Sequence, residues 1–104
     1  MSSEVTGATG LAARYASALF ELAAADKALD TVAADLDQLE QMVRESDDLQ
    51  RLLRSPVISR DAQSKAMAAI GEKAGFSKLT MNFIGVVAGN RRLFALPGML
   101  VAFR

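Results

Sequence analysis

The sequence predicts an all-α protein: a compact six-helix bundle in which the first and fifth helices are central. Apolar residues recur at the spacing of an amphipathic helix along most of the chain, and no segment keeps the alternation of a half-buried strand. Residues that begin or end helices separate the periodic segments. A length of 104 residues, with 51% hydrophobic and 23% charged residues, suits a single globular domain.

The first helix is predicted over residues 11–27, with Thr9 as its N-cap. In the stretch ARYASALFELA only Arg14, Ser17 and Glu21 are polar, and helical steps of 100° place these three within about 60° of one another. Most of the circumference is therefore apolar. One stripe suits the core and consists of Ala12, Ala16, Leu19, Phe20 and Ala23. A second stripe beside it consists of Leu11, Tyr15, Ala18 and Leu22.

The second and third helices are predicted over residues 29–46 and 47–54. The second has an ordinary amphipathic pattern, with leucine and valine on one narrow face. The third has acids in its first turn and arginines in its last, an order that the helix dipole favours. Pro56 disfavours helix at the residue before it, so we expect a connector there.

Ser59 and Ser77 are the predicted N-caps of the fourth and fifth helices, and Gly75 is predicted to end the fourth. The fifth helix extends to about residue 89 and is apolar over more than half of its circumference. Its core-facing residues are expected to be Met81, Ile84, Val87 and Ala88. Its second apolar group consists of Leu79, Phe83 and Val86.

Pro97 suits the first turn of a sixth helix, which reaches residue 104 without a capping signal. We therefore expect the chain to be part of a longer protein. The first ten residues, MSSEVTGATG, lack the basic start and apolar run of a signal peptide, so residues 1–10 are expected to be a flexible tail and residues 11–104 the six-helix domain. No run of 18 apolar residues is present, and we expect no direct membrane insertion.

The composition argues against an enzyme, a cofactor and a metal ion. The chain has neither cysteine nor histidine, which excludes thiolate nucleophiles, imidazole bases and the commonest zinc ligands. No glycine-rich phosphate loop is present. The acids that come closest to a cluster have no accompanying calcium loop and are expected to face solvent: Asp35, Asp37, Glu40, Asp47 and Asp48.

Charge is divided between the two halves of the chain. Residues 1–54 carry ten acids and five bases, a net charge of −5, and residues 55–104 carry two acids and seven bases, a net charge of +5. The bases are scattered rather than clustered, so we expect no nucleic-acid partner. The second apolar stripes of the first and fifth helices are either covered by neighbouring helices or open as a docking face, and periodicity leaves both arrangements open.

Three segments, taken in order, resemble the delta subunit of the bacterial F-type ATP synthase, whose mitochondrial counterpart is the oligomycin-sensitivity-conferring protein. They read RYASALFELA, LRSPVISRDAQSKAMAAI and NFIGVVAGNRRLFALPGMLVAF. The resemblance covers residues 11–104 and implies the six-helix N-terminal domain of a subunit whose C-terminal half is absent here. It implies a non-catalytic role in a proton-translocating ATP synthase, linking the catalytic head to the peripheral stalk, or stator.

The same resemblance implies the partners and their site. In that family the N-terminal domain binds the N-terminal helix of an alpha subunit between its first and fifth helices, and the stator b subunits bind through the C-terminal half. The residues implied for the groove here are Leu11, Tyr15, Ala18, Leu22, Leu79, Phe83 and Val86. The implied location is the cytoplasmic face of the inner membrane, or the matrix side in an organelle, with the isolated domain soluble.

Two alternatives and one departure accompany this resemblance. The chain is alternatively an all-helical RNA-binding module, which needs a contiguous basic surface, or a self-associating domain that buries the same groove in a symmetric dimer. Arg91 stands where the family often has glycine. A left-handed turn at that position disfavours arginine, so the conformation of the turn after the fifth helix does not follow from the resemblance.

Overall fold

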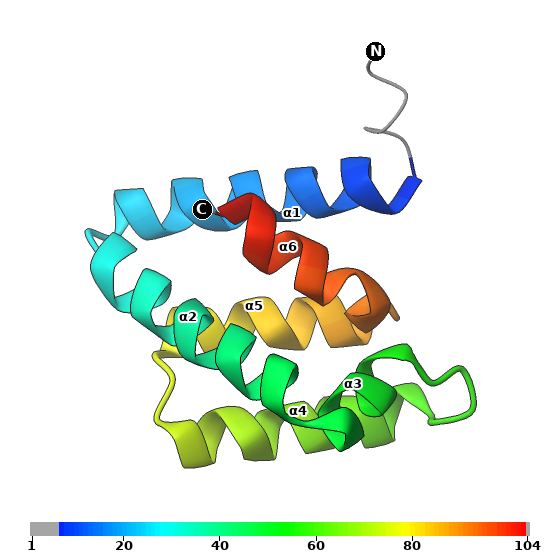
Figure 1. The fold of residues 1–104 in the computed structure, drawn as a ribbon. Helices are drawn as coiled ribbons and strands as arrows, with labels where there is room; N and C mark the ends of the chain where they lie inside the picture. Colours follow the sequence, from blue (N-terminus) through cyan, green and yellow to red (C-terminus); the bar gives the residue numbers. More distant parts are fainter. Residues whose placement is uncertain (1–6, 104) are drawn as a thin grey trace.

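The computed structural model describes residues 7–103, which fold into six α-helices (Figure 1). They are α1 (Gly7–Ala25), α2 (Leu29–Glu45), α3 (Asp47–Arg54), α4 (Arg60–Ala74), α5 (Lys78–Gly89) and α6 (Leu96–Phe103). A short 3₁₀ turn, η2 (Leu93–Ala95), precedes α6. No strand occurs within the described residues, and the predicted all-α, six-helix class is confirmed.

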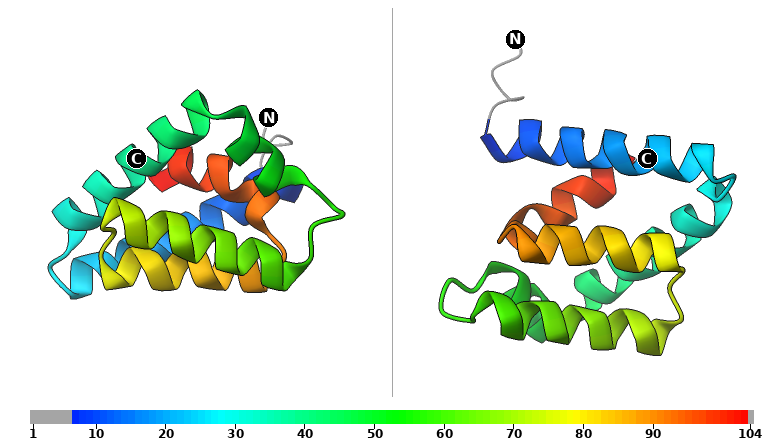
Figure 2. Two further views of the ribbon diagram at one scale, coloured as in Figure 1. Left: turned by 90° about the horizontal axis from the view of Figure 1, so that it is seen from below. Right: turned by 180° about the vertical axis from the view of Figure 1, so that it is seen from behind.

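The helices are arranged in two layers (Figure 2). Seen from behind, α1, α5 and α4 run side by side in the nearer layer, and α2, α3 and α6 cross them in the farther layer. Two helix pairs make the most extensive contacts in the bundle: α1 packs mainly against α6, and α5 packs mainly against α4. Thus α1 and α5 both contribute to the core, but neither is enclosed on all sides.

Small residues allow α6 to lie close to α1. A Cβ atom added to Gly98 would lie 3.3 Å from the Cβ of Ala12, which is closer than an ordinary van der Waals contact, so glycine at this position allows the close approach of the two helices. The core-facing side of α6 buries Leu96, Met99 and Leu100. Together with the buried alanines and Leu19 of α1, they form the centre of the core.

The predicted caps of α4 and α5 are present. The Oγ of Ser59 accepts a hydrogen bond from the backbone N–H of Ala62 at 3.1 Å, and the Oγ of Ser77 accepts one from Thr80 at 3.4 Å. Gly75 follows α4 with φ of 77°, the left-handed conformation that its lack of a Cβ permits. Ser46 caps α3 in the same way, which ends α2 at Glu45 rather than at Ser46.

The boundaries of α1 differ from the prediction at both ends. The helix begins at Gly7, so Thr9 lies within the helix rather than at an N-cap. Residues 1–6 of the expected tail lie outside the described part of the chain. At the other end, Lys27 adopts a left-handed φ of 56°, and the N–H of Ala28 donates to the carbonyl of Ala23 at 2.7 Å. This reversal ends α1 two residues earlier than predicted.

Asp35 of α2 is buried, although we expected it to face solvent. Its Oδ2 accepts two hydrogen bonds, from the backbone N–H of Ser77 at 2.8 Å and from the Oγ1 of Thr80 at 2.7 Å. The carboxylate therefore satisfies backbone and side-chain donors at the N-terminus of α5, where the helix dipole favours a negative charge. Its role is to fix the start of α5 against α2.

We predict that Asp35→Ala lowers the free energy of unfolding by about 1–3 kcal/mol, because it removes the acceptor of the partly buried Ser77 N–H and one partner of the buried Thr80 hydroxyl. Asp35→Asn keeps one acceptor oxygen and should lose less. Asp37→Ala, on the exposed side of the same helix, is the matched control and should change stability by less than about 0.5 kcal/mol. Urea unfolding followed by circular dichroism measures all three; equal stability of Asp35→Ala and Asp37→Ala would contradict this role.

Arg91 makes a left-handed turn after α5, with φ of 58°. Its Nη1 donates to the carbonyl of Ile58, in the connector between α3 and α4, at 2.8 Å and to the Oε1 of Gln63, in α4, at 3.1 Å. Arg60 makes the reverse contact, donating from Nη1 to the carbonyl of Gly89 at 3.4 Å. The turn suspected from the sequence therefore exists, and the arginine that makes it ties the end of α5 to the start of α4.

Two substitutions of Arg91 distinguish the energetic cost of its left-handed backbone conformation from the stabilisation that its side-chain hydrogen bonds provide. Arg91→Ala and Arg91→Gly lose the same hydrogen bonds, but only the alanine variant keeps a Cβ in the left-handed region. We expect Arg91→Gly to be the more stable of the two by about 1–2 kcal/mol in urea unfolding. If the alanine variant is as stable as the glycine variant, the left-handed conformation of this residue carries no cost.

Candidate functional site

An apolar groove lies between α1 and α5, with a volume of about 380 Å³. The two helices run antiparallel, as the view from behind in Figure 2 shows. The lining residues on α1 are Arg14, Tyr15, Ala18, Leu19 and Leu22, and those on α5 are Leu79, Asn82, Phe83 and Val86. Each helix presents residues at spacings of three and four, so the walls are two rows of side chains parallel to the helix axes.

The groove is a second apolar side of two helices that already contribute to the core. On α1, Leu19 is buried at its floor, whereas Leu22 on the rim is 57% exposed. On α5, Val86 is 55% exposed, although its neighbour Val87 is fully buried. Ala18 is exposed between larger side chains and leaves room for an incoming side chain or backbone. Open leucine and valine side chains in one contiguous patch are typical of a binding surface.

Polar groups occur only at the edges of the groove. Asn90, just after α5, donates from Nδ2 to the hydroxyl of Tyr15 at 2.9 Å and links the two helices at one end. Arg14 and Asn82 line the rim. Among the described residues no acid lines the groove, so the lining offers apolar contact with one positive charge, on Arg14.

The structure brings together six of the seven residues named from the sequence: Tyr15, Ala18, Leu22, Leu79, Phe83 and Val86. Leu11 is placed elsewhere, because it is only 9% exposed and packs in the core cluster. The groove also includes three residues that were not named. Leu19 had been assigned wholly to the core, and Arg14 and Asn82 lie four residues before Ala18 and Val86, which is the helical spacing that identifies them.

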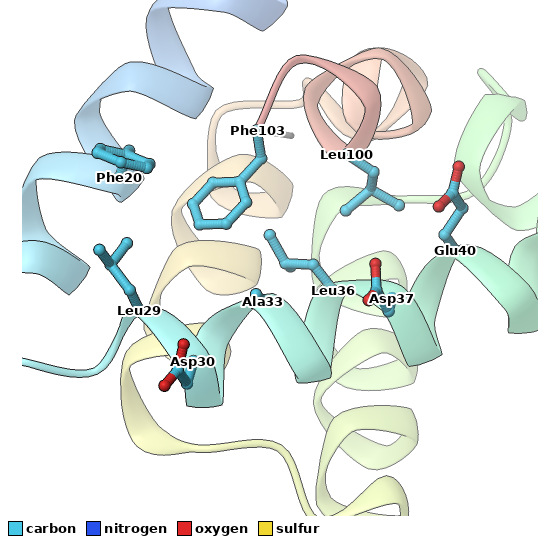
Figure 3. Close-up of a pocket in the computed structure, with 9 residues that line it drawn as sticks. All are labelled: Phe20, Leu29, Asp30, Ala33, Leu36, Asp37, Glu40, Leu100 and Phe103. Carbon is cyan, nitrogen blue, oxygen red and sulfur yellow. The ribbon is translucent and has the colours of Figure 1, made fainter.

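Phe20 is a correction to the predicted core of α1. The other four residues of that stripe are buried, but Phe20 is 47% exposed. It lies one helical step of 100° beyond Leu19, at the margin of the surface that α6 covers. Its ring packs against Phe103 at the end of α6, with ring centroids 5.8 Å apart (Figure 3).

Other kinds of site find no support in the described part of the chain. Residues 7–103 contain no group of acids that could hold a metal ion. None of the helices in this range combines the length and apolar character needed to span a membrane. Arg91 and Arg60 direct their guanidinium groups to backbone carbonyls, so two bases of the positive half serve packing rather than a contiguous basic surface.

The described residues form an all-helical domain with an open apolar groove between α1 and α5. Residues 11–104 match the family model described as ATP synthase delta (OSCP) subunit. The chain is 56% identical over 103 residues to ATP synthase subunit delta of Rhodospirillum rubrum, a match that covers 99% of this chain and 55% of the relative. It is 58% identical over 96 residues to ATP synthase subunit delta of Rhizobium johnstonii, covering 92% and 51%.

The chain therefore belongs to the ATP synthase delta (OSCP) subunit family. It spans about half the length of the curated relatives that it matches.

Proposed function

We propose that the chain is a non-catalytic connector in a proton-translocating F-type ATP synthase, and that it binds the N-terminal helix of an alpha subunit in the groove between α1 and α5. In this role it holds the catalytic head to the peripheral stalk at the membrane surface on the cytoplasmic or matrix side. The stator b subunits would bind the remainder of the full-length subunit. Membership of the delta subunit family supports the setting, and the open groove supports the contact.

The observation that carries the proposal is the pair of exposed apolar rows that face each other across the groove. An amphipathic helix can place one row of side chains between them and contact Ala18 closely. The groove has no ionisable group on its floor, so a carboxylate or ammonium group entering it would be desolvated without a partner. The preferred ligand is therefore a helix with an uncharged apolar face.

The free energies of burial and association predict only a modest affinity for this contact alone. Four apolar side chains buried at about 1.5–3 kcal/mol each contribute about 6–12 kcal/mol. Association opposes this with about 4–15 kcal/mol of lost freedom. A durable link in the assembled complex then depends on a second attachment, which raises the effective concentration of the first.

We predict that Ala18→Asp weakens binding of an alpha-subunit N-terminal peptide by about 3 kcal/mol, or roughly 100-fold, because the bound peptide would remove a carboxylate from water inside an apolar groove. Calorimetric titration of the full chain measures the affinity, and circular dichroism checks that helicity is kept. Ala13→Asp is the matched control, since Ala13 is exposed on the same helix outside the groove. Unchanged affinity of the Ala18 variant would remove this residue from the site.

Self-association is the alternative that the same groove allows. A symmetric dimer would bury Leu22 and Val86 of both copies, and Ala18→Asp would convert it to monomers. Sedimentation of the full chain without peptide distinguishes the two outcomes: a monomer that binds the peptide supports the connector, and a dimer that does not bind it contradicts the connector.

A further inference from the structure

A second apolar hollow, of about 320 Å³, lies on the other flank of α1 and shares no residue with the groove between α1 and α5 (Figure 3). Its apolar lining comes from three helices and consists of Phe20, Leu29, Ala33, Leu36, Leu100 and Phe103. We call it the acidic hollow, because its polar lining consists of Asp30, Asp37 and Glu40 of α2.

The apolar lining of the acidic hollow forms two sides between which a helix can bind. Phe20 and Phe103 form one wall, and Phe20 keeps nearly half of its surface open to water. On the α2 side, Leu29, Ala33 and Leu36 follow one another at spacings of four and three and form a single ridge. Leu36 is buried at the base of the hollow, whereas Leu29 and the small Ala33 are half-buried, so Ala33 leaves space for a side chain of an incoming helix.

The charged side chains that line the hollow within residues 7–103 are all acidic. Asp30 and Asp37 are exposed on α2, and within residues 7–103 neither has an ion pair. Glu40 lies farther along the same helix and pairs with Arg44 at 3.8 Å. A smaller adjoining hollow, which shares Phe20 and Phe103, is lined by Glu21 of α1. Among residues 7–103, no lysine or arginine lines either hollow.

We propose that the acidic hollow is a second docking site, and that its occupant is a basic amphipathic helix of a partner chain. Apolar residues of that helix enter between the phenylalanines and the α2 ridge, and flanking lysine or arginine side chains meet Asp30 and Asp37. Complementary charge selects this occupant: acidic segments are repelled, and a second copy of the same surface would bring like charges together. The groove between α1 and α5 has no acid and one arginine, so the two surfaces select different ligands, and this proposal does not rest on the proposed function.

A pair of synthetic peptides tests the charge selection. One is an amphipathic helix with leucines on one face and lysines on both flanks, and its twin has glutamates in place of the lysines. Titrated into the full chain at low salt, the lysine peptide should bind at least about tenfold more tightly, and the difference should shrink as salt is added. Equal affinities, or a difference that salt leaves unchanged, would overturn the proposal.

Charge-reversal variants then test whether the lysine peptide binds at the acidic hollow. Asp30→Lys/Asp37→Lys should lower the affinity for the lysine peptide about tenfold. Asp61→Lys/Glu72→Lys, which makes the same charge change at exposed positions of α4, should have a much smaller effect. If both double variants lose affinity equally, the peptide responds to net charge and not to the hollow.

Photocross-linking in the assembled enzyme complex identifies the natural occupant. A benzophenone amino acid replaces Ala33, and mass spectrometry identifies the segment that becomes attached. The proposal predicts a segment of another subunit in which lysines or arginines flank an apolar row. Attachment only to another part of the same chain, to a second copy of it, or to an acidic segment would overturn the proposal.

Discussion

The arrangement of the whole domain depends on the close contact between α6 and α1. Gly98 lies opposite Ala12 without a side chain that would separate the two helices, and this lets a short, strongly apolar α6 cover the alanine-rich stripe of α1. Because α6 is short, it covers only a narrow strip of the surface of α1. Both flanks of α1 therefore remain open, and the groove lies along one of them while the acidic hollow lies along the other.

The position of α5 is fixed at its two ends by polar side chains from other parts of the chain. At its N-terminus the Asp35 carboxylate of α2 accepts from Ser77 and Thr80. At its C-terminus Arg91 donates to Ile58 in the connector before α4. Hydrophobic packing is not directional, whereas hydrogen bonds at both ends define where the helix starts and stops. One wall of the groove is therefore set by contacts that lie outside the groove itself.

Local signals in the sequence predicted most of the fold, and the failures share a physical cause. Serine caps and the left-handed Gly75 depend on neighbouring residues only, so they could be identified from the chain. Asp35 has the polarity of a surface residue, but its partners lie more than forty positions away. Phe20 and Leu11 are both apolar, and which of the two is covered depends on where α6 lies. The two apolar sides of α1 could be predicted from periodicity; the distribution of burial between them could not.

The ties at both ends of α5 also bear on recognition. Because α1 and α5 are positioned by the core and by Asp35 and Arg91, the groove exists before any ligand arrives. A ligand then loses conformational entropy when it binds, whereas the already ordered backbone of the domain loses little. The surface is preorganised, and affinity differences among ligands should arise mainly from how well each ligand forms its helix, a property of the partner rather than of this protein.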